Sequence, residues 1–575
     1  MEYLKELYTS HIVFVLVTIS SFVLLQNFLI LIYSAITNTN PKNATTCTIK
    51  PPFDNIPMLP NCHPLLGHLI SESSSAIISQ MPSLSIETLR QHSKNGISSI
   101  WYLNHPVLIV FDPKAASTLL HSYADRNVPR LARKHISTNT SEKNILLLNG
   151  REWRMYRSAI HKSMTSELLK EYQSAMIEYA CKLTKSLKDK ISILNHSDNK
   201  NLSKQNTIQL HENVHQFMKM VTMDIFFRVS IGMDLQSCET LQVSKLAKYY
   251  ELNAKDFVRR LFIHPLRPWN YFYCIPSIDN IKRWYQNYYF RSVIGKYIQE
   301  KRSERIHGLT NCENAKKDIL SNMLAAQERG CINHEESLNM TNDEFLGLFS
   351  SLLNAGFETT STTLTYALYN LSRRPDIQQH LFEEIQNTIV TNDKEEILDL
   401  EKLVLCKAII NETLRLFPTA PQTTRAIREN ESLELNDLKL HGPFSVRIPI
   451  WAIHRDEENF PRPEEFLPER WVRKTTSNIW VERFLGDNSR EERDWNANFN
   501  ISPANRAAFF AFSAGARNCV GKKFAYQEAI IILAILISDL KFEVEDGYVC
   551  IPQRSGVIQS PKDGMPMKIS QRIQR

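Results

Sequence analysis

The longest apolar segment of the chain lies close to its N-terminus. Residues 12–36 contain 25 consecutive positions without a charge, and about 20 apolar residues are enough for a helix to cross a bilayer. A cleaved signal peptide is the alternative, but the run is long for one, and residues 1–11 carry Glu2, Lys5 and Glu6 without a positive excess. We therefore predict a transmembrane anchor over residues 12–36, preceded by a short segment, residues 1–11.

A polar and then proline-rich stretch follows this anchor. Residues 37–50 are polar, and the prolines after them are clustered at positions 51, 52, 57, 60 and 64. Because clustered prolines stiffen a connection, we interpret residues 37–68 as a hinge. Residues 69–575 contain no internal repeat or low-complexity tract and are expected to form one domain.

Helical periodicity dominates this domain. Residues 165–335 follow a mostly helical pattern, and from residue 342 apolar side chains recur at helical spacing, at Phe345, Leu348, Phe349, Leu352 and Leu353. A short run of β-branched and apolar residues at 107–111, ended by Asp112 and Pro113, predicts a buried strand.

Composition and charge exclude some classes of protein. The 575 residues are 43% hydrophobic and 22% charged, with a net charge of +7, which is ordinary for a folded globular protein. The mild positive charge suits an anionic membrane surface or an acidic protein partner, and the absence of a basic arm argues against a nucleic acid partner. The ten cysteines are scattered without CxxC pairs, which favours one functional cysteine in a reducing compartment over a disulfide framework or a zinc site.

One cysteine lies in a stretch suited to holding a flat ligand. The stretch reads Phe512-Ser-Ala-Gly515-Ala-Arg517-Asn-Cys519-Val-Gly521 and precedes an apolar run at 524–540. A helix start favours a thiolate through its free N–H groups and partial positive charge. The glycines permit close approach of a flat group, and Arg517 can pair with an anionic edge. Haem has a flat face, an iron for Cys519 and two propionates; a loop with a buried structural cysteine is the alternative.

A second stretch would be costly in a helix selected for stability alone. Residues 355–363 read Ala-Gly-Phe-Glu-Thr-Thr-Ser-Thr-Thr. Five consecutive hydroxyl residues are poor helix formers, and their side chains can bond carbonyl groups and bend the helix. A buried Glu358 beside them is costly without partners. An ordinary kinked core helix is the alternative.

These two stretches resemble the distal helix and the haem-binding loop of the cytochrome P450 family, in its membrane-anchored eukaryotic microsomal type. The resemblance implies a mainly α fold: a single α-rich haem-thiolate domain with a small β-rich part, preceded by one N-terminal transmembrane helix. It also implies that Cys519 is the axial ligand of the haem iron, with Phe512, Gly515, Arg517 and Gly521 contacting the haem.

The same resemblance assigns roles on the opposite face of the haem. Ala355 and Gly356 would leave space above the iron. Thr359 would donate a hydrogen bond to iron-bound oxygen, and Glu358, in the acidic position of the motif, would relay protons from water.

Three further residues are expected to bind the haem propionates. Trp153 and Arg157 share a helix face at i, i+4, and a surface cation–π pair is the alternative. The spacing is similar to the family's Trp-x-x-x-Arg, whose side chains reach a propionate. Arg425, on the turn after Pro421, is a further candidate, although a single arginine on a strand is more often at the surface.

A structural triad is also implied. Glu412 and Arg415 form a Glu-x-x-Arg pair, and Arg470 lies in a later Pro-x-Arg-Trp segment. In the family such residues form a buried Glu–Arg–Arg network behind the haem loop, so we expect these three to lock together.

The chain departs from the family pattern at two places. Residues 442–449 lack the Pro-x-Gly-Thr turn that is common before His454. The segment between Trp471 and Phe512 is longer than usual, and its charged part predicts an elongated, solvated surface loop at about 472–508.

The function implied by the resemblance is monooxygenation: insertion of one atom of O2 into a lipophilic small molecule such as a fatty acid, sterol, terpenoid or xenobiotic. The implied cofactor is haem b (iron protoporphyrin IX), with NADPH and flavins acting indirectly through NADPH–cytochrome P450 reductase, and with cytochrome b5 as a further partner. Lys522 and Lys523, just after the ligand loop, are hypothesised to dock an acidic reductase surface. The expected location is the endoplasmic reticulum membrane, single-pass, with a cytosolic catalytic domain.

Two other functions stay open at this point. The first is a haem-thiolate isomerase or dehydratase that needs no reductase, against which the Glu358–Thr359 pair argues. The second is a non-catalytic membrane haem-binding protein.

Overall fold

The described part of the chain covers most of the predicted domain. The computed structural model describes residues 53, 56–58, 90–91, 93–102, 105–126, 144–198, 209–258, 278–306, 318–324, 340–392, 395–435, 438–474, 480–482, 505–555 and 558–572. The predicted anchor at 12–36, most of the hinge at 37–68 and most of the predicted loop at 472–508 lie outside these residues. Within the described ranges, no helix combines the length and the apolar character needed to cross a bilayer.

Helices dominate the described structure, as the mainly α prediction requires. They are α4 (Pro113–Ser122), α6 (Gly150–Lys162), α7 (Ser166–Asp198), α8 (Val214–Ile231), α9 (Ser237–Thr240), α10 (Lys245–Val258), α12 (Ile278–Ile306), α14 (Asn342–Arg373), α15 (Pro375–Thr388), α16 (Val404–Leu416), α17 (Ile450–Ile453) and α19 (Lys522–Asp539), with 3-10 turns η4 (Pro468–Arg470), η5 (Arg506–Ala508) and η6 (Gly515–Arg517).

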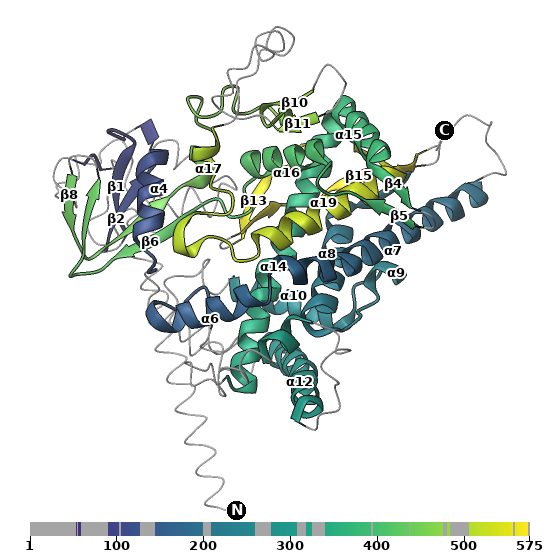
Figure 1. Cartoon of the computed structure of the whole chain (residues 1–575), viewed down its shortest axis with the longest axis horizontal. Coiled ribbons are helices and arrows are strands. Elements are labelled where there is room, and N and C mark those ends of the chain that lie inside the picture. The colour runs from purple at the N-terminus through teal and green to yellow at the C-terminus, as the bar shows by residue number, and fades with distance from the viewer. Residues whose placement is uncertain are drawn as a thin grey trace, which may run out of the picture.

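The strands form small sheets. They are β1 (Ile97–Tyr102), β2 (His105–Val110), β3 (Leu210–Asn213), β4 (Ile389–Asn392), β5 (Glu395–Leu398), β6 (Thr423–Ile427), β7 (Ser432–Leu435), β8 (Leu438–His441), β9 (Phe444–Ile448), β10 (Val472–Lys474), β11 (Trp480–Glu482), β12 (Leu540–Val544), β13 (Pro552–Ser555), β14 (Ile558–Pro561) and β15 (Pro566–Gln571). The largest sheet has the order β1-β2-β9-β6. Its strands lie with α4 at one end of the molecule, away from the main helical body (Figure 1).

Two long helices organise the helical body. α14 begins with a capping box, in which Thr341 and Glu344 satisfy each other's backbone N–H groups. It packs against α8, α12, α16 and α19. α19 is apolar around most of its circumference and largely buried, as expected for a helix enclosed by others. Both helices therefore have little freedom to move relative to the core.

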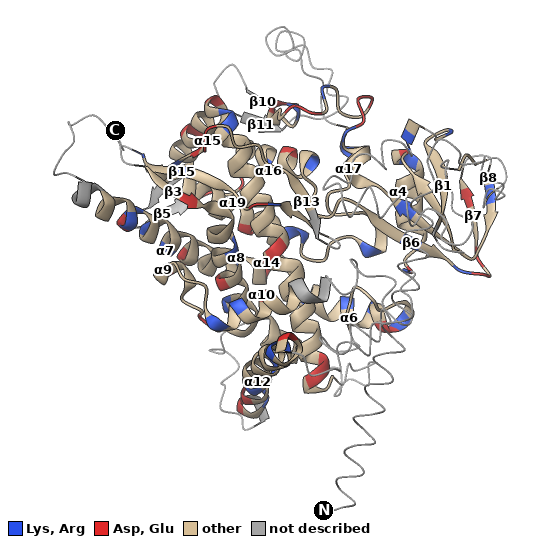
Figure 2. Cartoon of the chain, turned by 180° about the vertical axis from the view of Figure 1, so that it is seen from behind, with Lys and Arg blue, Asp and Glu red and all other residues tan. Residues whose placement is uncertain are grey.

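Charged side chains lie mainly on the outer helices. Figure 2 shows both signs mixed along α7, α12 and α15, whereas α14 and α19 are mostly uncharged.

The predicted strand at 107–111 is present as β2. The helix after it, α4, has Pro113 in its first turn and Asp112 as its N-cap. The Asp112 carboxylate accepts from the Ala115 N–H at 2.7 Å.

Candidate functional site

The loop that carries Cys519 has a fixed shape. The N–H of Cys519 donates to the carbonyl of Phe512 at 2.9 Å, which closes the turn. Gly515 has φ +66°, and a Cβ built on it would lie 1.9 Å from the carbonyl oxygen of Leu120 at the end of α4. Only glycine fits there, so this position holds the loop tightly against α4.

The surroundings of the Cys519 thiol act in opposite directions on its ionisation. The side chain is accessible, yet the protein atoms around it raise the pKa of the thiol through desolvation. The N–H of Gly521 and the cations of Arg157 and Lys522 lower the pKa and so favour the thiolate. An added metal cation would shift this balance decisively toward the thiolate.

Arg517 points away from solvent, into the protein. Its guanidinium donates to the carbonyl oxygens of Ala124 and Leu148 at 2.7 Å each, and to the Asn149 side chain at 2.8 Å. It lies over the indole ring of Trp153, with Cζ 3.8 Å from the ring centroid.

Trp153 and Arg157 lie on one face of α6, as predicted. Trp153 is buried, and Arg157 lies farther from its ring than Arg517 does, at 5.8 Å. Arg157 donates to the backbone carbonyl of Asn518 at 2.8 Å and also to the Asn518 side-chain oxygen. This pair is therefore not a surface cation–π contact, because it fastens α6 to the residue before Cys519.

Arg425 is fully buried on β6, not at the surface. Its Nε donates to the Tyr123 carbonyl at 2.9 Å and its Nη1 to the Thr424 carbonyl at 2.9 Å, but its Nη2 has no partner in the described part of the chain. Burial and the nearby charge of Arg126 lower the pKa of Arg425 to about 9. A buried guanidinium with a free donor points to a missing acceptor.

The sequence-based interpretation did not include Arg126. No motif marks Arg126 in the sequence. Its Nε is buried without a partner in the described ranges, and burial together with Arg157 lowers its pKa. The charge of Arg126 also lowers the pKa of Arg425 and of Arg517, so Arg126 interacts with each of the other three arginines.

Four guanidiniums thus converge with little negative charge to balance them. Burial and the neighbouring arginines lower the pKa of Arg517 to about 9, and the carboxylate of Asp125 acts against this shift. Asp125 is itself paired with the exposed Arg428. An anionic group bound here would remove the repulsion and fill the free donors, and the two propionates of a haem have the required charge.

The predicted residues of α14 face different neighbours. Thr359 Oγ1 donates to the Ala355 carbonyl at 2.6 Å, and Ala355 is exposed. A Cβ on Gly356 would lie 2.9 Å from the Phe226 ring of α8, so this glycine allows the two helices to approach closely. Glu358 is half-buried, and its charge raises the pKa of Tyr250, which burial raises most.

The triad residues Glu412, Arg415 and Arg470 lie together and are fully buried. Glu412 accepts two hydrogen bonds from Arg415, at 2.9 and 2.8 Å, and one from Arg470 at 3.0 Å. The indole N–H of Trp471 and the backbone N–H of Leu467 complete its shell, at 2.8 and 3.0 Å. Burial alone would raise the pKa of Glu412, but the two arginines outweigh it and the pKa is lowered.

A buried histidine connects this triad to the cysteine loop, which sequence patterns did not reveal. The backbone carbonyl of His454 accepts from Arg415 at 3.0 Å, and its Nε2 accepts from the N–H of Phe510 at 2.9 Å. Its ring also stacks on Phe509, with centroids 5.2 Å apart. Burial and two arginines lower its pKa to about 3, so the ring is neutral and can accept.

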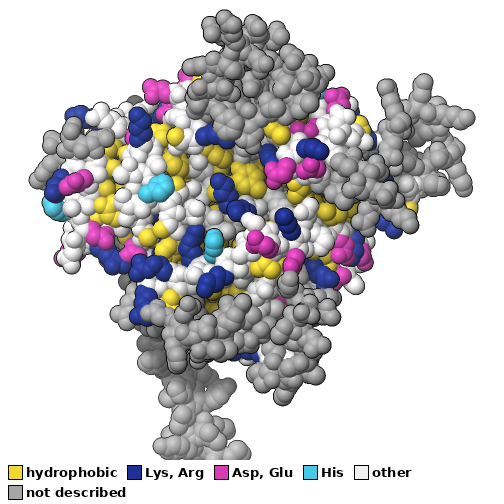
Figure 3. All heavy atoms as spheres, in the orientation of Figure 1, with side chains coloured by type: hydrophobic (Ala, Val, Ile, Leu, Met, Phe, Trp, Pro, Cys, Tyr) yellow, Lys and Arg dark blue, Asp and Glu magenta, His cyan; other side chains and the backbone are white. Residues whose placement is uncertain are grey.

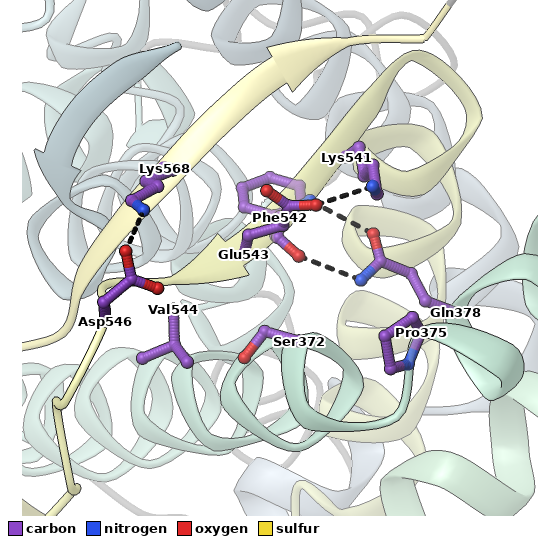
Figure 4. A pocket seen from close by; sticks show the side chains of 9 residues that line it. All are labelled: Ser372, Pro375, Gln378, Lys541, Phe542, Glu543, Val544, Asp546 and Lys568. Atoms are coloured by element: carbon purple, nitrogen blue, oxygen red, sulfur yellow. Dashed lines mark hydrogen bonds and ion pairs between the residues drawn. The ribbon is translucent and has the colours of Figure 1, made fainter.

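A separate small pocket lies far from these residues in the fold. It has a volume of about 200 Å³ and lies between α15 and the strands β12 and β15 (Figure 4). Its lysines are paired, Lys568 with Asp546 at 2.7 Å and Lys541 with Glu543 at 2.6 Å. Because these charges satisfy one another, this pocket is a weaker candidate than the cysteine loop.

The fold and the arginine cluster define the class of protein. A thiol at a helix start, a glycine that removes a side chain from the loop, and four converging guanidiniums fit a haem held through a thiolate. In the described part of the chain, no group of three or more His, Cys, Asp or Glu residues is arranged to hold a metal ion by itself.

Comparison with known proteins identifies the family. The cytochrome P450 family model matches residues 57–566. "Cytochrome P450 3A17" of Cavia porcellus is 26% identical over 498 residues, covering 84% of this chain and 86% of that protein. "Cytochrome P450 3A56" of Fundulus heteroclitus is 24% identical over 472 residues, covering 80% and 82%. "Sterol 26-hydroxylase, mitochondrial" of Rattus norvegicus is 31% identical over 229 residues, covering 40% and 39%.

The chain therefore belongs to the cytochrome P450 family. It is an oxidoreductase of the monooxygenase class, and haem is the cofactor of its family. The family prediction made from the sequence is confirmed; the microsomal type is not tested by these matches.

Proposed function

We propose that this protein inserts one atom of O2 into a lipophilic small molecule, with electrons delivered from NADPH by a flavin-containing reductase. The observation that carries the proposal is the fit between the Cys519 loop and the four guanidiniums beside it. The haem, when bound through the Cys519 thiolate, supplies the oxygen-activating chemistry.

The chain's own residues hold the cofactor and handle protons in this proposal. The propionates would be bound by Arg126, Arg157, Arg425 and Arg517. Trp153 would hold Arg517 in place through the contact between its ring and the guanidinium. Thr359 Oγ1 holds its proton on the Ala355 carbonyl. Rotation of that hydroxyl would direct the proton toward the reacting O2 instead. Glu358 would then replace this proton with one taken from water.

A basic surface supports docking of an acidic reductase. Lys522 and Lys523 are exposed at the start of α19. In the face shown in Figure 3, dark blue side chains gather over the region between α6 and α19. Opposite charge on a partner would speed its association there.

The membrane location is also part of the proposal. The apolar segment at 12–36 would anchor the protein in the endoplasmic reticulum membrane, single-pass, with the catalytic domain in the cytosol. A lipophilic substrate such as a fatty acid, sterol, terpenoid or xenobiotic would be concentrated in that bilayer. Cytochrome b5 is proposed as a second partner.

Reconstitution tests the proposed function. The full chain with haem, NADPH–cytochrome P450 reductase and a lipophilic compound library should form a product that carries one 18O atom from 18O2. Product that forms without NADPH and without label would instead identify an isomerase or dehydratase. Binding of haem without any product would indicate a haem-binding protein that is not catalytic.

A Thr359→Ala substitution tests the proton-handling role. We expect NADPH consumption to continue while product per NADPH falls at least about tenfold, because a positioned proton-transfer group typically contributes about 100-fold or more to the rate. Thr388→Ala is the matched control, since Thr388 donates to Glu384 O in the same way but on α15. Unchanged coupling in Thr359→Ala would remove Thr359 from the mechanism.

A further inference from the structure

Two buried polar side chains lie on α14 and α19, two helices that pack against each other. Glu528, on α19, is 1% exposed, and Thr360, on α14, is 3% exposed. Within the described part of the chain, the two carboxyl oxygens of Glu528 form no hydrogen bond. The same holds for the hydroxyl group of Thr360. Thr360 nevertheless lies close enough to lower the pKa of Glu528, at a geometry short of a full hydrogen bond.

Three of the hydroxyls close to Thr360 along α14 behave differently, whereas that of Thr362 also has no hydrogen bond in the described part of the chain. Thr359 and Thr363 donate to the carbonyls four residues earlier, at 2.6 and 2.9 Å, and Ser361 donates to the Glu358 carbonyl at 3.1 Å. Such back-bonding is the usual fate of a hydroxyl inside a helix. Thr360 does not make it, so its proton is available to Glu528.

Among the described residues, Glu528 has no charged partner that would offset its burial. Desolvation raises the pKa of Glu528 to about 8, and within the described ranges the Thr360 side chain opposes this shift. At neutral pH the group is therefore a carboxylic acid with a carbonyl oxygen that can accept one hydrogen bond. Leucine at this position would fill the same space without leaving polar atoms unpaired.

The positions of the two residues suggest what the pair does. Glu528 lies nine residues after Cys519 on the helix that continues the ligand loop, and Thr360 follows Thr359 directly. We propose that a hydrogen bond from the Thr360 hydroxyl to the Glu528 side chain makes Glu528 a positioning residue, which fixes the Glu358–Thr359 turn of α14 relative to the Cys519 loop. The consequence for catalysis rests on the proposed monooxygenase function, whereas the hydrogen bond itself does not.

A neutral acid suits this role for an electrostatic reason. A buried carboxylate or ammonium beside α14 would act on the ionisation of Glu358 and of the Cys519 thiol, because charges interact strongly where water is excluded. A neutral pair connects the two helices without such a field. Fixing Thr360 also fixes the rotation of the turn that carries Thr359, because neighbouring residues of one helix turn cannot rotate independently.

Infrared spectroscopy of the folded holoprotein tests the hydrogen bond without turnover. We expect a carboxylic acid C=O band at neutral pH that disappears in Glu528→Gln. The band should move to higher frequency in Thr360→Val, because the carbonyl loses its donor. In Thr362→Val it should stay in place, since Thr362 is also a buried hydroxyl without a partner on α14 but is not the group that acts on Glu528. A band that is absent from the wild type, or that does not move in Thr360→Val, overturns the proposal.

Coupling of NADPH use to product tests the positioning role. Per folded haem protein, Glu528→Leu and Thr360→Val should each lower product per NADPH about threefold or more, since small displacements of a reacting group are costly. The double variant should lose no more than the stronger single variant, and Glu528→Gln, which can still accept from Thr360, should recover most of the coupling.

The outcomes separate this inference from the proposed function. A purely structural role would lower the melting temperature and the yield of haem protein in Glu528→Leu but leave coupling unchanged, and that result overturns the positioning role. If the wild type itself forms no product, the monooxygenase proposal fails, and the infrared result alone then decides whether the Glu528–Thr360 bond exists.

Discussion

Gly515 is constrained twice at a single residue. Its φ of +66° is unfavourable for other residues, and a Cβ would overlap the Leu120 carbonyl at 1.9 Å. The first constraint costs about 1 kcal/mol, whereas the second requires the loop to separate from α4. Since Arg517 and Cys519 follow within four residues, that separation would displace the whole binding loop.

Gly515→Ala should therefore lower haem retention, not merely stability. We expect the yield of thiolate-ligated protein, measured from the spectrum of the reduced carbon monoxide complex, to fall at least about tenfold. Gly547→Ala is the matched control, because Gly547 has φ +76° but no atom within 4 Å of its added Cβ. Equal losses in the two variants would show that backbone strain alone matters.

His454 makes the stability of the protein depend on pH. Its folded-state pKa of about 3 lies below the ordinary value of 6.5, so between these two values the unfolded chain binds a proton that the folded chain does not. Stability from this group is fully present above pH 6.5 and declines as the pH falls toward 3. Between pH 6.5 and 5 the loss should be about 2 kcal/mol.

Urea unfolding of the wild type and of His454→Gln at pH 7 and pH 5 measures this contribution. Glutamine can still accept from the Phe510 N–H but does not titrate. The loss on acidification should be smaller in the variant by about 2 kcal/mol. Identical losses would mean that other groups account for the acid sensitivity.

At the scale of elements, the Glu412 triad joins α16 to the segment that ends in η4. Arg415 also donates to the Pro463 and Glu465 carbonyls, at 2.6 and 2.9 Å, so one guanidinium satisfies several backbone groups of that segment. His454 connects this network to the segment that leads to Cys519, because its Nε2 accepts a hydrogen bond from the Phe510 N–H. The three elements are therefore expected to unfold together.

Glu412→Ala should destabilise the protein by about 3–5 kcal/mol, because it leaves two buried guanidiniums without their counter-ion. Arg462→Ala provides the comparison, since its pair with Glu465 is half exposed and should contribute less than about 1 kcal/mol. Chemical unfolding of both variants provides the measurement. A loss for Glu412→Ala as small as that for Arg462→Ala would contradict the buried network.

The α14 helix illustrates how far local patterns reach. Its apolar spacing correctly predicts a helix from 342 to 373, in spite of the poor helix formers at its centre. Gly356 has a packing role that the sequence did not predict, because its missing side chain accommodates Phe226 of α8; its predicted role above the iron stays a prediction. A sequence pattern within α14 cannot predict contact with an aromatic ring of a helix that lies more than 100 residues earlier in the chain.

At the scale of the whole molecule, the basic surface over α6 and the start of α19 should govern association with the reductase. Charge reversal in Lys522→Glu/Lys523→Glu should raise the reductase concentration for half-maximal rate, most strongly at low salt. Lys296→Glu/Lys402→Glu changes the net charge equally at two exposed sites elsewhere, on α12 and before α16. Equal effects in both double variants would show that overall charge, not the docking surface, is responsible.

The sequence by itself determined the parts of this protein whose contacts are local. Helical periods, the Cys519 loop and the Glu412–Arg415 pair all depend on spacings of about ten residues or fewer, and for these the chain order largely dictates the geometry. The same short motifs predict the family, because they specify the residues that would bind the cofactor. They do not specify the tertiary structure.

Only the tertiary structure decided which distant charges meet. Arg126 joins the guanidinium cluster. Arg517 lies over Trp153, and Thr360 lies close enough to Glu528 to lower its pKa. In each of these last two pairs, the residues are more than 100 positions apart along the chain. Whether a cation is a solvated surface group or part of a buried site depends on packing, because burial and neighbouring charge set its hydration and its pKa. A pattern along the chain carries no record of either quantity.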